Sequence, residues 1–227
     1  MKPRFAILFL LAGASASAQD FNLDWGQLGK YRDEDARLIA SGQKPDIVLL
    51  GDSITEGWVS KRPGVFIAQR VGRGISGQTT SQMLVRFRQD VIALHPKYVQ
   101  IMAGTNDIAG NTGPMTLEMT EANLMSMTEL AQANGIKVIL ASVPPSAGFP
   151  WRPGLEVTGK IVALNEWMKD YAAAHGAIYA DYWSALQDGK GGMKPGLAYD
   201  GVHPTEQGYD SMLPVLEDAL MKASAAR

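Results

Sequence analysis

The stretch that decides the fold reads "DIVLLGDSITEGW" and runs from Asp46 to Trp58. Its apolar residues predict a buried strand over residues 46–50, and this strand ends at Gly51-Asp52-Ser53. Glycine, aspartate and serine are ordinary turn residues, so the tripeptide fits a simple turn before a helix. It also fits a nucleophilic serine held at the end of a central strand. The tripeptide alone does not separate these two interpretations.

Composition limits the classes of protein to consider. The chain has 227 residues, 46% of them hydrophobic and 19% charged, with a formal net charge of -2. This length suits one α/β domain with a full core. No basic stripe suggests a nucleic-acid partner, and no apolar run of about 18 residues suggests a membrane span. The absence of cysteine excludes disulfides, a thiol nucleophile and the lipid-bearing cysteine of a lipoprotein.

The first 18 residues have the pattern of a secretory signal. Lys2 and Arg4 form a positive region, Phe5–Ala12 is a short apolar run, and Ala16-Ser17-Ala18 supplies small residues for cleavage. We therefore expect a signal peptide over residues 1–18 and a single domain over residues 19–227. Such a protein is exported to the periplasm or the medium.

Short apolar runs alternate with longer helical patterns along the rest of the chain. Strands are expected at Asp46–Leu50, Gln69–Val71, Tyr98–Met102, Ile136–Ala141 and Ala177–Ala180. Helices are expected at Asp24–Ala40, Thr79–Leu94, Thr116–Asn134, Val157–His175 and Thr205–Ala223. This alternation predicts an α/β fold with a parallel sheet that is covered on both faces. Ligands of such sheets bind beyond the carboxyl ends of the strands.

Three histidines are available as a base for a serine nucleophile. His175 and His95 lie at expected helix ends, where a structural role is the simpler interpretation. His203 follows Asp200 by three residues in "DGVHPT". That spacing allows the carboxylate to reach Nδ1, which leaves Nε2 free to accept a hydroxyl proton. A loop imidazole that helps to cap the last helix remains the alternative.

Two further strand ends carry residues that could stabilise an oxyanion. Gly77 lies in "GRGISGQTT", and Asn106 lies in "GTND". A backbone N–H beside a glycine and a neutral side-chain amide are both suitable hydrogen-bond donors for this purpose. A turn glycine and an Asx turn are the corresponding structural alternatives.

Taken together, these motifs resemble the GDSL family of esterases and lipases, also called SGNH hydrolases. The family carries four blocks in a fixed order, matched here by Gly51-Asp52-Ser53, Gly77, Gly104-Thr105-Asn106-Asp107 and Asp200-Gly201-Val202-His203. The resemblance covers essentially the whole mature chain, and it includes the platelet-activating-factor acetylhydrolase-like branch of the family. Ile54 replaces the leucine of the family name, which is a conservative aliphatic exchange.

The resemblance implies a three-layer α/β/α sandwich with a flavodoxin-like parallel sheet. It also implies that Ser53 is the nucleophile, His203 the general base and Asp200 the acid that orients it. The oxyanion hole would comprise the N–H groups of Ser53 and Gly77 and the amide of Asn106. The serine lies outside a Gly-x-Ser-x-Gly motif, which agrees with this fold rather than the larger α/β-hydrolase fold.

We expect a serine esterase that cleaves small acyl esters, with O-acetyl groups on carbohydrates favoured because the protein is expected to be exported. The loop "SVPPSAGFPWRPG" offers Trp151 and Arg152 as a wall of the substrate pocket, although it could equally be a rigid surface connection. No cofactor is needed, and the aspartates in the blocks lack the spacing of a metal site. A lysophospholipase or thioesterase, and a non-catalytic carbohydrate-binding relative, remain alternatives.

Overall fold

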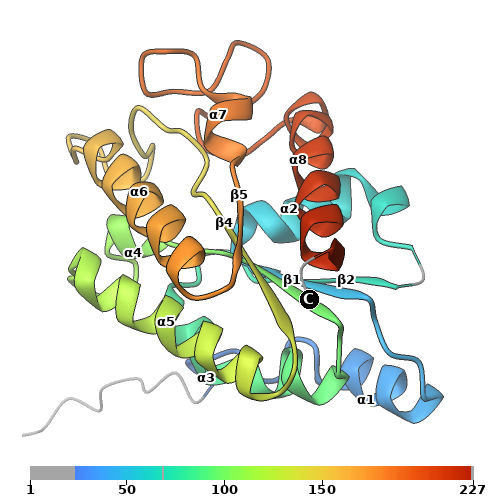
Figure 1. The fold of residues 1–227 in the computed structure, drawn as a ribbon. Helices are drawn as coiled ribbons and strands as arrows, with labels where there is room; N and C mark the ends of the chain where they lie inside the picture. The colour runs from blue at the N-terminus through green and yellow to red at the C-terminus, as the bar shows by residue number, and fades with distance from the viewer. Residues whose placement is uncertain (1–23, 68, 226–227) are drawn as a thin grey trace, which may run out of the picture.

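The computed structural model describes residues 24–67 and 69–225, which form a parallel sheet between two layers of helices (Figure 1). The strand order is β2-β1-β3-β4-β5, and the strands are β1 (Ile47–Gly51), β2 (Arg70–Gly74), β3 (Tyr98–Met102), β4 (Lys137–Ala141) and β5 (Ile178–Ala180). This order is the flavodoxin-like one. The predicted α/β/α sandwich with a parallel sheet is therefore confirmed.

Helices cover both faces of the sheet (Figure 1). One layer contains α1 (Arg32–Ser41), α3 (Thr80–Asp90), α5 (Leu117–Ala133) and α6 (Thr158–Ala174), with the short α4 (Thr105–Ala109) beside it. The other layer contains α2 (Ser53–Lys61), α7 (Tyr182–Leu186) and α8 (Glu206–Ala225). The 3-10 turns η1 (Pro63–Val65) and η2 (Ile92–Leu94) complete the elements.

The central strand β1 divides its side chains between two hydrophobic cores. Val48 and Leu50 belong to the core under α3, α5 and α6, whereas Ile47 and Leu49 belong to the core under α2, α7 and α8. All four side chains are at most 1% exposed, as the uninterrupted apolar run predicted.

The strand order creates a crevice at the carboxyl end of β1. The chain passes from β1 to β2 on one side and then returns to β3 on the other side. The three strands also end level with one another, because Gly51 is paired with Gly74 of β2 and with Met102 of β3. The loops after β1 and β3 therefore meet at the switch point where such sheets bind ligands.

The helix predicted over Asp24–Ala40 is wrong in its first part. Residues 24–30 form turns, and α1 begins only at Arg32. Gly26 and Gly29 disfavour a helix here, and the Asp24 carboxylate accepts hydrogen bonds from the N–H groups of Leu28 and Gly29. Trp25 and Leu28, whose spacing suggested a helix, therefore lie in turns.

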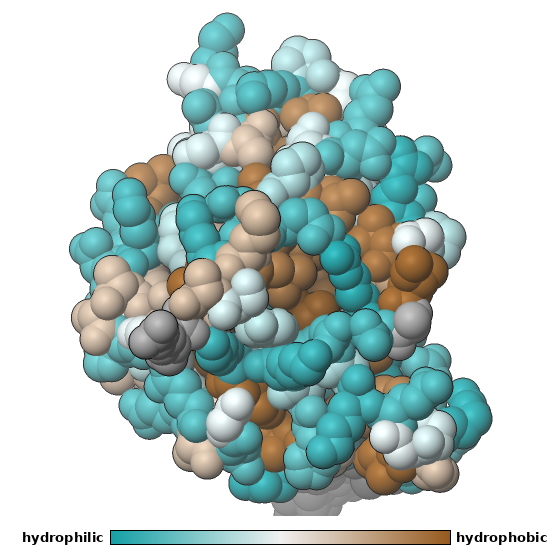
Figure 2. Space-filling model, turned by 45° about the vertical axis from the view of Figure 1, so that its right-hand side comes forward, coloured by the Kyte–Doolittle hydropathy of each residue, from teal (hydrophilic) through white to brown (hydrophobic). Residues whose placement is uncertain are grey.

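The expected signal peptide, and with it the boundary of the domain, lies outside the described residues. Among the described helices, none combines the length and the apolar character that crossing a bilayer requires. Figure 2 shows hydrophilic side chains over most of one face, with hydrophobic side chains mainly in the hollows between them.

We predict that Gly74→Ala will strongly destabilise the protein. A Cβ at this position would lie 2.1 Å from the backbone nitrogen of Glu56 and 2.7 Å from the carbonyl oxygen of Asp52, and backbone atoms cannot move aside as a flexible side chain can. We expect a loss of at least about 2 kcal/mol in the free energy of unfolding, measured by urea denaturation. Gly64→Ala is the control, since a Cβ there meets nothing within 4 Å and its effect should stay within about 0.5 kcal/mol. Equal stability of the two variants would contradict this packing account.

Candidate active site

The structure brings together a serine, a histidine and an aspartate from distant parts of the chain. Ser53 is the first residue of α2, and only Asp52 separates it from the end of β1. Its Oγ lies 2.9 Å from Nε2 of His203, and Nδ1 of His203 lies 2.7 Å from Oδ2 of Asp200. A carboxylate can only accept at Nδ1, so Nδ1 carries the proton and Nε2 faces the hydroxyl as an acceptor. This arrangement can remove a proton from the serine hydroxyl.

The Asp200 carboxylate is fixed by its own loop. Its Oδ1 accepts hydrogen bonds from the backbone N–H groups of Val202 at 3.0 Å and His203 at 2.8 Å. Partial burial would raise the pKa of the Asp200 carboxyl, but the hydrogen bonds from His203 and Val202 outweigh it and hold the pKa below its ordinary value. The carboxylate therefore stays charged and orients the imidazole ring.

Contacts between α2 and α8 hold the serine and the histidine at this separation. Tyr209 on α8 donates its hydroxyl proton to the carbonyl of Ile54 at 2.8 Å, and its ring stacks on Trp58 with 5.5 Å between centroids. At the end of α2, Arg62 forms ion pairs of 2.6 Å with Glu206 and Asp210. The helix that begins at the serine is thus tied to the helix that follows the histidine.

Gly77 and Asn106 lie at the ends of the strands that flank β1. Gly77 has a φ of +77°, which favours glycine, and the buried amide of Asn106 belongs to α4. The Asn106 Nδ2 donates to the carbonyl of Gln78 at 3.0 Å and to Oδ2 of Asp52 at 3.2 Å. It therefore contacts the residue next to Ser53, and an ester oxygen could take the place of its longer contact.

Asp52 is a buried carboxyl group that the sequence analysis considered as a turn residue, as part of the Gly51-Asp52-Ser53 block and as a metal ligand without the required spacing. It caps α2, because its Oδ1 accepts a hydrogen bond of 2.9 Å from the N–H of Ile54. Burial raises the pKa of Asp52 from its ordinary 3.8 to about 6. Its place between Gly51 and Ser53 was visible in the sequence, but its contact with Asn106 was not.

Aromatic side chains flank the His203 imidazole. The Tyr199 ring stacks on it with 5.6 Å between centroids, and Trp151 lies 6.1 Å away in a tilted arrangement and stacks on Phe149. Trp151 is 39% exposed and Tyr199 is 62% exposed, so both rings offer surface to a ligand. Sequence reasoning missed Tyr199, although its position directly before Asp200 was a usable signal.

Arg152 and Trp151 line a hollow of about 750 Å³ beside this centre. Half of its ten lining residues are glycine or proline, namely Gly110, Gly113, Pro114, Pro153 and Gly154. Arg152 itself donates to the carbonyl of Gly110 at 2.9 Å. Its guanidinium therefore joins the two loops that form the hollow.

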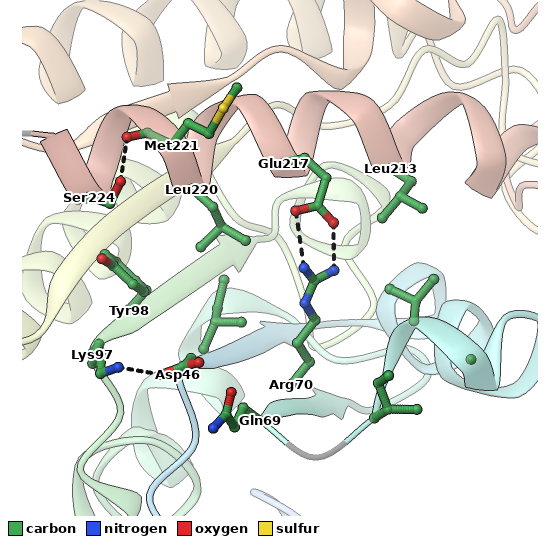
Figure 3. A pocket seen from close by; sticks show the side chains of 14 residues that line it. Asp46, Gln69, Arg70, Lys97, Tyr98, Leu213, Glu217, Leu220, Met221 and Ser224 are labelled. Carbon is green, nitrogen blue, oxygen red and sulfur yellow. Dashed lines mark hydrogen bonds and ion pairs between the residues drawn. The ribbon is translucent and has the colours of Figure 1, made fainter.

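Another hollow, of about 790 Å³, lies at the opposite edge of the sheet (Figure 3). It is lined by the first residues of β1, β2 and β3 and by one side of α8. Two ion pairs cross its wall, between Arg70 and Glu217 at 2.7 Å and between Lys97 and Asp46 at 2.6 Å. Because it lies at the amino ends of the strands, it is separate from the serine centre.

Within residues 24–67 and 69–225, no three or more histidine, aspartate or glutamate side chains converge so that they could hold a metal ion.

Comparison with known proteins identifies the family. Residues 49–210 match the model of the GDSL-like lipase/acylhydrolase family, which is more than half of the chain. The chain belongs to this family. It is a carboxylic ester hydrolase, as the sequence motifs predicted.

This GDSL hydrolase is similar to three other proteins over most of its length. The crystal structure of a putative acylhydrolase from Bacteroides fragilis superposes with a TM-score of 0.82 at 44% identity, over 88% of this chain and 98% of that one. An acetylxylan esterase from Geobacillus stearothermophilus is 27% identical over 75% of this chain and 90% of its own length. Esterase TesA from Pseudomonas aeruginosa is 28% identical over 70% of this chain and 79% of its own length.

The raised pKa of Asp52 predicts a pH dependence of stability. The folded protein keeps this proton up to about pH 6, whereas the unfolded chain releases it near pH 4, so unfolding releases a proton between these values. The contribution of Asp52 to stability therefore falls as pH rises through this window, by an amount on the order of 2–3 kcal/mol.

The Asp52→Asn variant should lack this part of the decline. Urea denaturation of both proteins at pH 4 and pH 7 measures the decline in stability. Burial also raises the pKa of Asp35 and Asp107, so these two groups add to the decline equally in wild type and variant. An identical change in stability between the two pH values for wild type and variant would show that Asp52 ionises normally.

Proposed function

We propose that this GDSL hydrolase cleaves small acyl esters, in particular O-acetyl esters of carbohydrates, through an acyl-enzyme on Ser53. The observation that carries the proposal is the unbroken chain of hydrogen bonds from the Ser53 hydroxyl through His203 to Asp200. A serine nucleophile needs such a base, and the base needs an orienting acid.

The reaction has two steps. His203 Nε2 accepts the Ser53 hydroxyl proton while Oγ attacks the ester carbonyl. The N–H groups of Ser53 and Gly77 and the amide of Asn106 stabilise the oxyanion that forms. The C–O bond then breaks and the alcohol leaves with the proton from His203. Water, deprotonated by the same imidazole, releases the acid and restores the hydroxyl.

The aromatic rings around His203 support a sugar as the alcohol part of the ester. Trp151 and Tyr199 both expose ring surface beside the imidazole that protonates the leaving alcohol. The apolar face of a sugar ring can stack on such a ring. The similarity to an acetylxylan esterase and the expected export of the protein point in the same direction.

The hollow beside Trp151 supports a small acyl group. Glycine and proline make up half of its lining, and only Ile108 and Leu155 among its lining residues have long aliphatic side chains, which is a small number to cover a fatty acyl chain. A lysophospholipase or thioesterase of the same family would need such a cover.

We predict that Ser53→Ala will lower kcat toward p-nitrophenyl acetate by about 10³-fold or more, because the nucleophile is absent. His203→Ala should have a similar effect, and Asp200→Asn a smaller but substantial one. A fluorophosphonate probe should label wild type and leave Ser53→Ala unlabelled. Wild-type turnover no faster than that of Ser53→Ala, with no labelling, would instead support a non-catalytic relative.

A second prediction concerns the substrate. Along a series of p-nitrophenyl esters from acetyl to palmitoyl, kcat/KM should be highest for acetyl and fall with chain length. Acetylated xylooligosaccharides should release acetate with a higher kcat/KM than p-nitrophenyl acetate, because the sugar adds contacts with the aromatic rings. A maximum at long chains would favour the lysophospholipase or thioesterase alternative.

A further inference from the structure

The side chain of Asn111 lies where three parts of the proposed site meet. Its Nδ2 donates to Oδ1 of Asn106 at 2.7 Å and to the carbonyl of Gly77 at 3.3 Å. Its Oδ1 accepts a hydrogen bond of 3.3 Å from the indole N–H of Trp151. A single exposed amide thus contacts both residues proposed to hold the oxyanion, besides Ser53, and one of the exposed aromatic rings.

These contacts determine which end of the Asn106 amide faces the site. The nitrogen of Asn106 faces two acceptors, the Gln78 carbonyl and the Asp52 carboxyl, and its oxygen faces the NH₂ group of Asn111. A half-turn of the Asn106 amide would place its oxygen against the Gln78 carbonyl and its nitrogen against the Asn111 nitrogen. Asn111 therefore supplies the donor that makes the productive orientation the favoured one.

The backbone places Asn111 firmly in this position. Its N–H donates to the carbonyl of Asn106 at 3.0 Å, and the N–H of Gly110 donates to the carbonyl of Asp107 at 2.9 Å. Gly110 has a φ of +69°, which favours glycine, and Arg152 donates to its carbonyl. The chain thus turns back at Gly110 and returns the Asn111 side chain to the residue five positions earlier.

We propose that Asn111 is a positioning residue that holds the Asn106 amide and the Gly77 turn in the orientation needed to bind the oxyanion. Its contact with Trp151 couples this orientation to the position of the ring expected to bind the sugar. The proposal rests on the oxyanion roles proposed above for Gly77 and Asn106. Asn111 acts through these two residues and does not itself contact the ester.

Two substitutions test the positioning role. Asn111→Asp keeps the shape but replaces the donor NH₂ with an oxygen that faces the acceptors of Asn106 and Gly77, and Asn111→Ala removes the contacts without adding charge. We expect kcat toward p-nitrophenyl acetate to fall about 10- to 100-fold in the first variant and about 5-fold in the second, with KM changed by less than about 3-fold. Asn134→Asp, a like substitution at an exposed asparagine at the end of α5, should keep wild-type kcat.

A purely structural role of Asn111 gives a different result. It would lower the thermal midpoint of Asn111→Asp below that of Asn134→Asp and leave kcat unchanged. That outcome, or a wild-type kcat in Asn111→Ala, would overturn the proposal.

Asn106→Ala separates this proposal from the one on which it rests. If Asn106→Ala keeps wild-type kcat, the oxyanion assignment itself fails. If Asn106→Ala loses about 10²-fold or more but Asn111→Asp does not lose activity, only the positioning role fails. Where both are correct, adding Asn111→Asp to Asn106→Ala should produce much less further loss than it does in wild type.

A double-mutant cycle tests the coupling between Asn111 and Trp151. Trp151→Phe keeps an aromatic ring but removes the indole N–H. It should lower kcat toward p-nitrophenyl acetate about 2- to 5-fold in wild type and have almost no effect in Asn111→Ala. Equal effects in the two backgrounds would overturn the coupling.

Discussion

The geometry of the site depends on one buried cation, the guanidinium of Arg86. It donates to the carbonyl of Gly51 at 3.1 Å and of Arg73 at 2.9 Å, and so joins the carboxyl ends of β1 and β2. A third hydrogen bond, of 2.6 Å, reaches the side chain of Gln78 in the loop that carries Gly77. A charge that is fully buried is costly unless it is paired, and Asp90 provides the counter-charge at 2.9 Å.

The polar network continues from this cation to the edge of the crevice. The Gln78 carbonyl accepts from Asn106, and Asn106 contacts both Asp52 and Asn111. Buried networks with satisfied partners are rigid, which suits the proposed oxyanion donors, because such donors must be in place before charge develops on the substrate. His203, the proposed base, comes instead from a surface loop that is held by contacts between α2 and α8. The site thus combines a rigid buried side with a proposed base near the surface.

The sequence predicted the parts of this arrangement that leave a local pattern. Apolar runs revealed the parallel sheet, and the offset of His203 from Asp200 indicated a contact that the structure contains. The roles of Arg86 and Asn111 also depend on contacts between segments far apart in the chain, such as Arg86 with Gly51 and Asn111 with Trp151, for which no spacing rule exists. The helix expected at Asp24–Ala40 is wrong in its first part because Gly26 and Gly29 disfavour a helix there despite the apolar spacing. Periodicity therefore located the sheet better than it located the first helix.

The central claim is that ester cleavage passes through a covalent acyl group on Ser53. Mass spectrometry of enzyme quenched with acid during turnover of p-nitrophenyl acetate tests it most directly. The account predicts a species heavier by one acetyl group, with the added mass on the peptide that contains Ser53. It also predicts that this species is absent from Ser53→Ala. Acetylation at another residue, or equal acetylation of the alanine variant, would contradict it.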